Sequence, residues 1–121
     1  MLNLIGIGLA DPSDVTVKGL ELIKSSDRVY LETYTSRLSC TIEDLEKFYG
    51  KEVLPAGRDF VEGAEQLLAE AKDMSVSLLI IGDPLSATTH WDILGRATEK
   101  GIETHIIYNA SVFSAVAVTG L

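Results

Sequence analysis

Three apolar stretches of this 121-residue chain are each followed by glycine, small and polar residues that could bind a ligand. Residues 78–81 lead into Gly82-Asp83-Pro84, residues 2–7 lead into Gly8-Leu9, and residues 104–108 lead into Asn109-Ala110-Ser111. Ligands of open α/β sheets bind at the carboxyl ends of the strands. The three turns therefore predict one cleft, whose backbone groups and small side chains suit a flat, polar cofactor.

Two of these turns have a simpler interpretation as well. The Asp83 carboxylate could accept a ribose hydroxyl or an ammonium group, or it could form a turn by bonding its own backbone. Gly6-Ile7-Gly8 after a strand begins a dinucleotide-binding motif, but Asp11 stands where the third glycine is needed. The loop after residues 2–7 is therefore either a ligand loop or a bare turn.

Side chains for acid–base catalysis or metal binding are few. His90 could be a general base, or a residue that caps or packs a helix start. His105 falls within an expected strand, so no Ser/His/Asp or Cys/His constellation can be assembled. Two histidines and the single Cys40 argue against a metal site. We predict no dedicated catalytic side chain and no metal ligand. Around the loop after the second strand, Tyr30, Tyr34 and Arg37 either touch a substrate or are ordinary surface or core residues.

The turns must be positioned by the elements between them. Strands are expected at residues 2–7, 27–32, 51–54, 78–81 and 104–108, and helices at residues 16–25, 41–50, 60–72, 89–100 and from 112 onward. Thr16 and the Thr41/Asp44 pair would cap the first two helices, and Asp59 with Glu62 the third. This alternation predicts an α/β fold in which helices flank a five-stranded parallel sheet.

Composition limits the classes of protein that this chain can be. Its length fits one domain, and an apolar content of 46% excludes a disordered chain. A net charge of -8 argues against direct nucleic-acid binding. The absence of a long apolar run, of a basic leader and of a second cysteine favours a cytoplasmic protein outside the membrane. The apolar C-terminal segment suggests a fragment, or an end that is buried against another surface.

Six segments of the chain resemble the diphthine synthase family of the tetrapyrrole methylase-like superfamily. The most specific are Gly82-Asp83-Pro84 with Ala87-Thr88-Thr89-His90, Tyr34-Thr35-Ser36 and Asn109-Ala110-Ser111; the others are residues 4–9, 16–21 and 28–32. The resemblance covers nearly the whole chain. Leu85 departs from it modestly, because phenylalanine is common there.

The resemblance implies transfer of methyl groups from S-adenosylmethionine to a modified histidine of translation elongation factor 2, in diphthamide biosynthesis. It also implies a homodimer. Residues 1–121 would be the N-terminal α/β methylase domain, without the C-terminal domain of the family, which leaves the activity of this chain alone open. The cofactor would be lined by Leu9, Asp83, Ser86, Ser111 and Val112. Position 86 varies in the family, so we expect a backbone contact there.

Two other functions are compatible with the residues. One is a non-catalytic α/β module that binds a nucleoside cofactor or a partner protein. The other is the dinucleotide-binding domain of an oxidoreductase, which Asp11 in place of glycine argues against. Comparing the binding of S-adenosylmethionine with that of NAD would separate the three functions.

Overall fold

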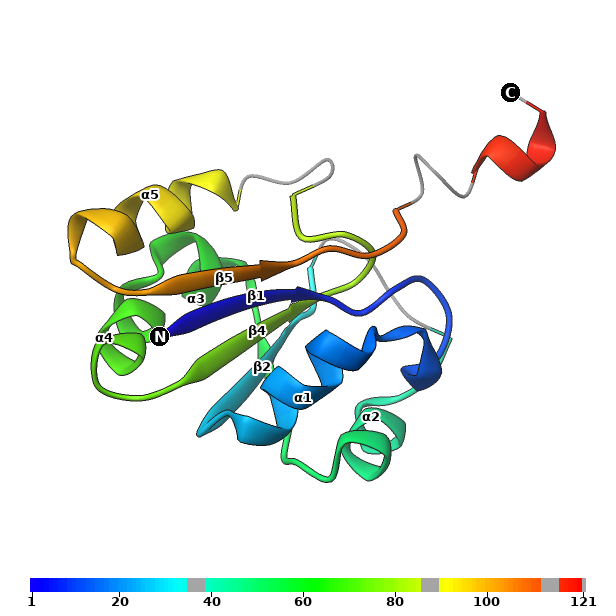
Figure 1. The fold of residues 1–121 in the computed structure, drawn as a ribbon, viewed down its shortest axis with the longest axis horizontal. Coiled ribbons are helices and arrows are strands. Elements are labelled where there is room, and N and C mark those ends of the chain that lie inside the picture. The colour runs from blue at the N-terminus through cyan, green and yellow to red at the C-terminus, as the bar shows by residue number, and fades with distance from the viewer. Residues whose placement is uncertain (35–38, 86–89, 112–115, 121) are drawn as a thin grey trace.

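The computed structural model describes residues 1–34, 39–85, 90–111 and 116–120. Its five strands form one parallel sheet in the order β3-β2-β4-β1-β5, which confirms the predicted fold (Figure 1). The central strands β1 and β4 pair from Leu2 with Val76 to Gly6 with Ile80. The strands are β1 (Leu2–Gly6), β2 (Arg28–Glu32), β3 (Leu54–Ala56), β4 (Val76–Ile80) and β5 (Thr104–Ile107).

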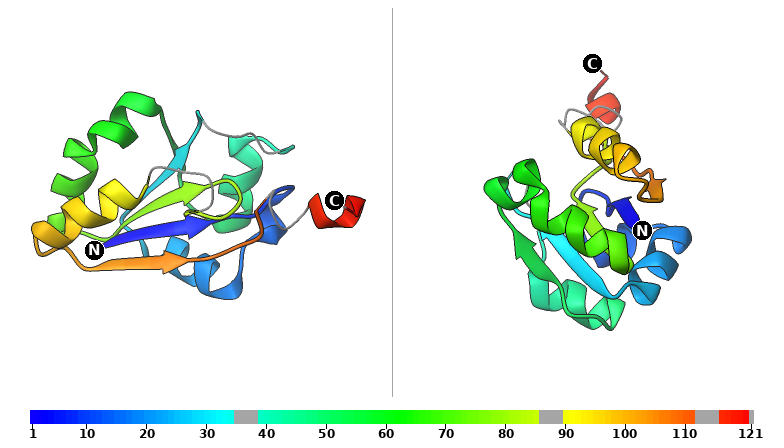
Figure 2. Two further views of the ribbon diagram at one scale, coloured as in Figure 1. Left: turned by 90° about the horizontal axis from the view of Figure 1, so that it is seen from above. Right: turned by 90° about the vertical axis from the view of Figure 1, so that its left-hand side faces the viewer.

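Helices cover both faces of this sheet, as the views in Figures 1 and 2 show. Alternate residues of each inner strand therefore face different cores. In β4, Leu78 packs into the core beneath α3, α4 and α5, and Leu79 into the core beneath α1 and α2. The helices are α1 (Val17–Ser25), α2 (Ile42–Tyr49), α3 (Arg58–Gly63), α4 (Glu65–Asp73) and α5 (Trp91–Glu99), with 3-10 turns η1 (Pro12–Asp14) and η2 (Val116–Thr119).

The first two helix starts are capped as predicted. The Thr16 hydroxyl accepts a hydrogen bond from the Gly19 amide at the start of α1. Thr41 and Asp44 form a reciprocal capping box at α2, in which each side chain accepts from the backbone of the other. These hydrogen bonds satisfy amides that have no partner within a helix.

The single helix predicted over residues 60–72 is wrong. Ala64 adopts a left-handed conformation with φ of 57°, which ends α3 and begins α4. The proposed Asp59 cap is wrong as well, because Gly57 precedes α3 and makes no side-chain cap. The Ala64 side chain is fully buried in the core, and the apolar periodicity continues across the break. Periodicity alone therefore could not reveal it.

Two further boundaries differ from the prediction. The third strand contains Pro55 instead of ending at it. Proline is tolerated there because β3 is the edge of the sheet, where one side of the strand has no partner. The helix expected from residue 112 onward begins outside the described residues, and η2 is a 3-10 turn.

Tyr49 offers a test of the core beneath α1 and α2. Its ring is buried, and its hydroxyl has no hydrogen-bond partner among the described residues; burial raises the pKa of this phenol. An unpaired buried hydroxyl costs about 1 kcal/mol or more. We expect Tyr49→Phe to raise the free energy of unfolding by about 1 kcal/mol, measured by urea denaturation. A loss of stability would show that the hydroxyl has a stabilising partner.

Candidate functional site

The turns after β1 and β4 are joined by backbone hydrogen bonds. The Gly82 amide donates to the Gly8 carbonyl at 2.8 Å, and the Gly8 amide donates to the Gly82 carbonyl at 3.4 Å. Both glycines have positive φ, 82° at Gly8 and 81° at Gly82, a conformation that glycine adopts without strain. The two loops therefore form one fixed rim at the carboxyl edge of the sheet.

Gly6 allows these loops to lie this close. A Cβ atom at this position would lie 2.5 Å from the Gly82 carbonyl oxygen and 2.8 Å from Cδ of Pro84. Neither neighbour is the end of a flexible side chain, so a larger residue at position 6 would have to move the backbone.

Asp83 connects this rim to the turn after β5. Its Oδ1 accepts a hydrogen bond from the Asn109 amide at 3.0 Å, and its Oδ2 accepts one from the Leu85 amide at 3.3 Å. The second contact is the turn-forming bond that the sequence suggested as the alternative to ligand binding. Asp83 therefore has a structural role whether or not it also binds a ligand.

The Asn109 side chain ties the turn after β5 to the end of β1 and to η1. Its Nδ2 donates to the carbonyl oxygens of Gly6 at 3.1 Å and Asp14 at 2.9 Å, and its Oδ1 accepts from the Ala110 amide at 2.7 Å. The convergence of the three strand ends predicted from the sequence is thus confirmed, and both the Asp83 carboxylate and the Asn109 amide hold it.

Leu9 and Ser111 are two more of the predicted cofactor residues that the structure describes. The Leu9 side chain is exposed (36%) although it is apolar, and Ser111 is buried. An exposed leucine beside backbone polar groups fits a ligand with a flat apolar ring and polar edges. The other two predicted cofactor residues, Ser86 and Val112, lie outside the described residues.

The Gly-x-Gly turn does not continue as a dinucleotide motif. Asp11, in the place of the third glycine, caps η1, and its carboxylate accepts from the Ser13 amide. Hydrogen bonds from the Ser13 hydroxyl and, second, from the Ser13 amide lower the pKa of Asp11. The loop is closed by its own side chains, where a dinucleotide motif would leave backbone amides open at a helix start.

A second polar group lies beside the rim, where β2 ends and α5 begins. His90 and Glu32 are almost completely buried, with side chains exposed by 2% and 1%, and His90 Nε2 lies 2.8 Å from Glu32 Oε2. His90 precedes α5 but makes no side-chain cap. It is therefore a buried residue, as its packing alternative predicted, but its contact is a carboxylate.

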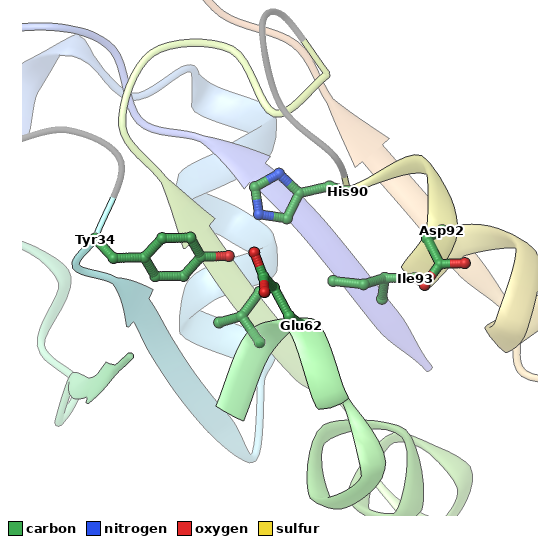
Figure 3. Close-up of a pocket in the computed structure, with 6 residues that line it drawn as sticks. Tyr34, Glu62, His90, Asp92 and Ile93 are labelled. Atoms are coloured by element: carbon green, nitrogen blue, oxygen red, sulfur yellow. The ribbon is translucent and has the colours of Figure 1, made fainter. Parts of the chain in front are cut away.

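A pocket of about 200 Å³ opens beside this pair. Figure 3 shows the imidazole of His90 over the Tyr34 hydroxyl, which comes from the bend after β2, and the Glu62 carboxylate of α3. Arg58 lies 4.8 Å from the centre of the Tyr34 ring and 3.0 Å from Glu62. Burial, then the charges of Glu32 and Glu62, raise the pKa of Tyr34 to about 12. Tyr34 therefore remains a hydrogen-bond donor at neutral pH.

Sequence reasoning missed the contact between Glu32 and His90, and it assigned Glu62 as a capping partner of Asp59. Glu62 is exposed, but it also lines the pocket. One indication of the contact was present: Glu32 ends the apolar strand Val29-Tyr30-Leu31, where a charged side chain is costly to bury without a partner. His90 is the partner because β2 lies beside β4, the strand that precedes α5 in the chain. The sequence alone did not predict this order of strands.

The described part of the chain contains no cluster of three or more histidine, cysteine or acidic side chains that could hold a metal ion. Within the same residues, every helix is too short or too polar to cross a bilayer.

Comparison with known sequences gives matches over the whole chain. Residues 1–120 match the family model of the tetrapyrrole (corrin/porphyrin) methylases. The chain is 52% identical over 122 residues to the diphthine methyl ester synthase of Aspergillus fumigatus, and 49% identical over 122 residues to that of Homo sapiens. Each alignment includes 100% of this chain and only 43% of the length of the relative. The chain thus spans less than half the length of these relatives.

Solved structures give the same result for the fold. A crystal structure of diphthine synthase superposes with a TM-score of 0.94 at 44% identity, covering 99% of this chain and 49% of that one. A structure from Entamoeba histolytica superposes with a TM-score of 0.89 at 47% identity, covering 100% of this chain and 46% of that one.

Proposed function

This chain belongs to the tetrapyrrole methylase family, and we propose that it is the N-terminal α/β domain of a diphthine methyl ester synthase. The observation that carries the proposal is an identity of about 50% to enzymes of that name along the entire chain. The reaction is the transfer of methyl groups from S-adenosylmethionine to the modified histidine of elongation factor 2. A C-terminal domain would complete the cofactor site and much of the protein-substrate surface.

The rim at the carboxyl edge of the sheet is the proposed cofactor site. S-adenosylmethionine supplies an electrophilic methyl group on a sulfonium sulfur. Leu9 offers an apolar contact for a base, and Ser111 offers a polar edge. Asp83 is oriented by Asn109 and Leu85. Ser86 and Val112 remain predicted cofactor residues. The chain would contribute to catalysis mainly by binding and orienting the cofactor and excluding water.

Partners and location follow from the proposed reaction. The protein substrate is elongation factor 2, recognised without direct nucleic-acid binding, and the reaction takes place in the cytoplasm. The homodimer also remains part of the proposal. Apolar and aromatic side chains are exposed on this domain, among them Trp91 and Tyr108. Exposed apolar groups mark interaction sites, which supports the proposal that another domain or subunit covers them.

Calorimetric titration with S-adenosylhomocysteine tests the cofactor site. We expect the complete protein to bind the ligand and the 121-residue chain to bind it more weakly, because half of the site would be missing. NAD is the negative control. Comparable binding by the short chain would make it a self-sufficient module, and failure of the complete protein to bind would overturn the methyltransferase proposal.

Leu9→Asp tests which surface is used. Loss of a buried leucine contact costs about 1.5–3 kcal/mol, so we expect the dissociation constant of S-adenosylhomocysteine to rise roughly 10- to 100-fold. Val17→Asp is the matched control, because Val17 is also an exposed apolar residue (76%) but lies in α1. Equal affinities for the two variants would remove Leu9 from the site.

A further inference from the structure

Acidic side chains surround the pocket beside His90. Glu62 of α3 and Asp92 of α5 line it, and Glu32 Oε2 lies 2.8 Å from Nε2 of the His90 ring, which forms another part of the wall. Burial first, and then the charges of Glu32 and Glu62, raise the pKa of the Tyr34 phenol, which also lines the pocket. An effect of this sign from nearby carboxylates means that the electrostatic potential at the Tyr34 hydroxyl is negative. The pocket therefore favours a ligand that carries positive charge.

A cation of the protein contacts two of the groups that line this pocket. The Arg58 guanidinium lies 4.8 Å from the centre of the Tyr34 ring, and its Nη1 lies 3.0 Å from Glu62 Oε1. An aromatic face beside a carboxylate is an arrangement that attracts cations. The Arg58 and Glu62 side chains are 61% and 48% exposed, so solvent screens their contact and another cation can replace it. Asp92 lies 3.7 Å from Arg96 but is 72% exposed, and its charge is screened in the same way.

His90 forms a wall of the pocket that has no hydrogen bond. Its side chain is 2% exposed, and within the described residues neither ring nitrogen makes a hydrogen bond, although Nε2 lies close to Glu32. Figure 3 shows that the imidazole points toward the Tyr34 hydroxyl and the Glu62 carboxylate. A buried polar side chain in this state costs stability. A polar ligand in the pocket would lower that cost, which favours a binding site over an empty gap in the packing.

The size of the pocket limits the ligand to a small group. Its volume of about 200 Å³ is below the roughly 300–1,000 Å³ of pockets for drug-sized molecules, so a whole cofactor does not fit. Ile93 adds an apolar surface to the acidic and aromatic side chains. An alkylammonium group matches all of these features, because it is small and positively charged and carries methyl or methylene groups around its nitrogen.

We propose that this pocket binds an alkylammonium group, with Tyr34 and Glu62 as the main binding residues. The part that this group has in methyl transfer rests on the proposed function. Two molecules of that reaction can carry it. S-adenosylmethionine has an ammonium in its amino acid part, and a neutral nitrogen of the methyl acceptor becomes positively charged when it takes a methyl group from a sulfonium. The pocket adjoins the end of β2, which pairs with β4, so it shares one edge of the sheet with the proposed cofactor rim.

The first experiment titrates the complete protein with choline and with 3,3-dimethyl-1-butanol, which has nearly the same shape but no charge. Binding is followed by nuclear magnetic resonance of the Ile93 methyl groups. We expect choline to shift the Ile93 signal saturably and to bind at least about fivefold more tightly than the neutral alcohol, the effect of one cation–aromatic contact. The absence of a saturable shift with choline, or equal affinities for the two compounds, would overturn the proposal.

Glu62→Gln and Arg58→Gln are expected to change the affinity for choline in opposite directions. Glu62→Gln removes a carboxylate from the pocket and should weaken choline binding about fivefold, whereas Arg58→Gln removes a competing cation and should strengthen it about twofold. Both side chains are exposed and form a contact between residues four apart in α3, so both variants should fold. Glu65→Gln is the matched control, because Glu65 is also exposed but lines a different groove, beside α4.

A purely structural role of the Arg58–Glu62 contact would shift both variants in the same direction. That result, or an affinity of Glu62→Gln within about twofold of that of Glu65→Gln, would overturn the assignment of the pocket.

Two further measurements on Glu62→Gln identify which molecule carries the ammonium. If it belongs to the cofactor, calorimetry should show weaker binding of S-adenosylhomocysteine. If it belongs to the methyl acceptor, the KM for modified elongation factor 2 should rise while the affinity for S-adenosylhomocysteine is kept. A variant that changes neither quantity would overturn the part of the pocket in methyl transfer. Failure of the unmutated protein to bind S-adenosylhomocysteine would instead refute the proposed function, and the choline titrations would still decide whether the pocket binds an alkylammonium group.

Discussion

Gly6→Ala is expected to lower the free energy of unfolding by about 3 kcal/mol, at the upper end of the cost of overpacking. The added methyl group would meet the Gly82 carbonyl oxygen at 2.5 Å and Pro84 Cδ at 2.8 Å. The central strands β1 and β4 are fixed by their pairing over five residues. The steric clash must therefore be relieved by movement of the turns that follow these strands. We therefore also expect weaker binding of S-adenosylhomocysteine, measured by calorimetry beside urea denaturation.

Gly95→Ala is the matched control for this substitution. Gly95 lies within α5, and a Cβ atom there would meet nothing within 4 Å. Alanine is preferred to glycine in a helix by about 1 kcal/mol, so this variant should be more stable than the unmutated protein. If Gly6→Ala changed stability by less than about 0.5 kcal/mol, as surface substitutions do, the close approach at Gly6 would be refuted.

Asn109→Ala should cost about 2–3 kcal/mol, because three hydrogen bonds of about 1 kcal/mol each are lost. Two of them end on the backbone carbonyl oxygens of Gly6, at the end of β1, and of Asp14, in η1. Their loss would loosen the rim that is proposed to bind the cofactor. We expect both the free energy of unfolding and the affinity for S-adenosylhomocysteine to fall.

Asn3→Ala separates these two effects. Asn3 is buried at the opposite end of β1, where its amide donates to the Ser77 hydroxyl at 3.2 Å. This variant should lose stability but keep ligand affinity once it is folded. If both asparagine variants lost affinity to the same extent, the effect of Asn109 would be one of general stability and not of the rim.

The sequence predicted the features that depend on local patterns. Apolar runs marked the strands, and Thr16 and Thr41 marked two helix starts, because a cap involves residues only three apart. The convergence of the three turns also followed, since parallel strands end at one edge. The resemblance to diphthine synthases identified the family from short motifs such as Gly82-Asp83-Pro84.

The features that depend on distant contacts could not be predicted in this way. Ala64 breaks a helix although its side chain continues the apolar stripe. Asn109 was placed in one of the turns of the predicted cleft, but the hydrogen bonds from its side-chain amide to Gly6 and Asp14, distant in sequence, were not foreseen. The contact of Glu32 with His90 appears only when β2 is placed beside β4. In each case tertiary structure decides among conformations or partners that local sequence leaves open.

The strand order also has a consequence for how the protein is made. β1 leaves the ribosome first, yet its neighbours in the sheet are β4 and β5. At ordinary rates of synthesis, of about 5–20 residues per second, several seconds pass before β4 follows. During that time the apolar segment Leu2–Gly6 has neither of its native partners, β4 and β5. The strands β2 and β3 have already been synthesised, but they are not neighbours of β1 in the native sheet. We therefore expect nascent chains that stop before β4 to expose β1 and to depend on chaperones.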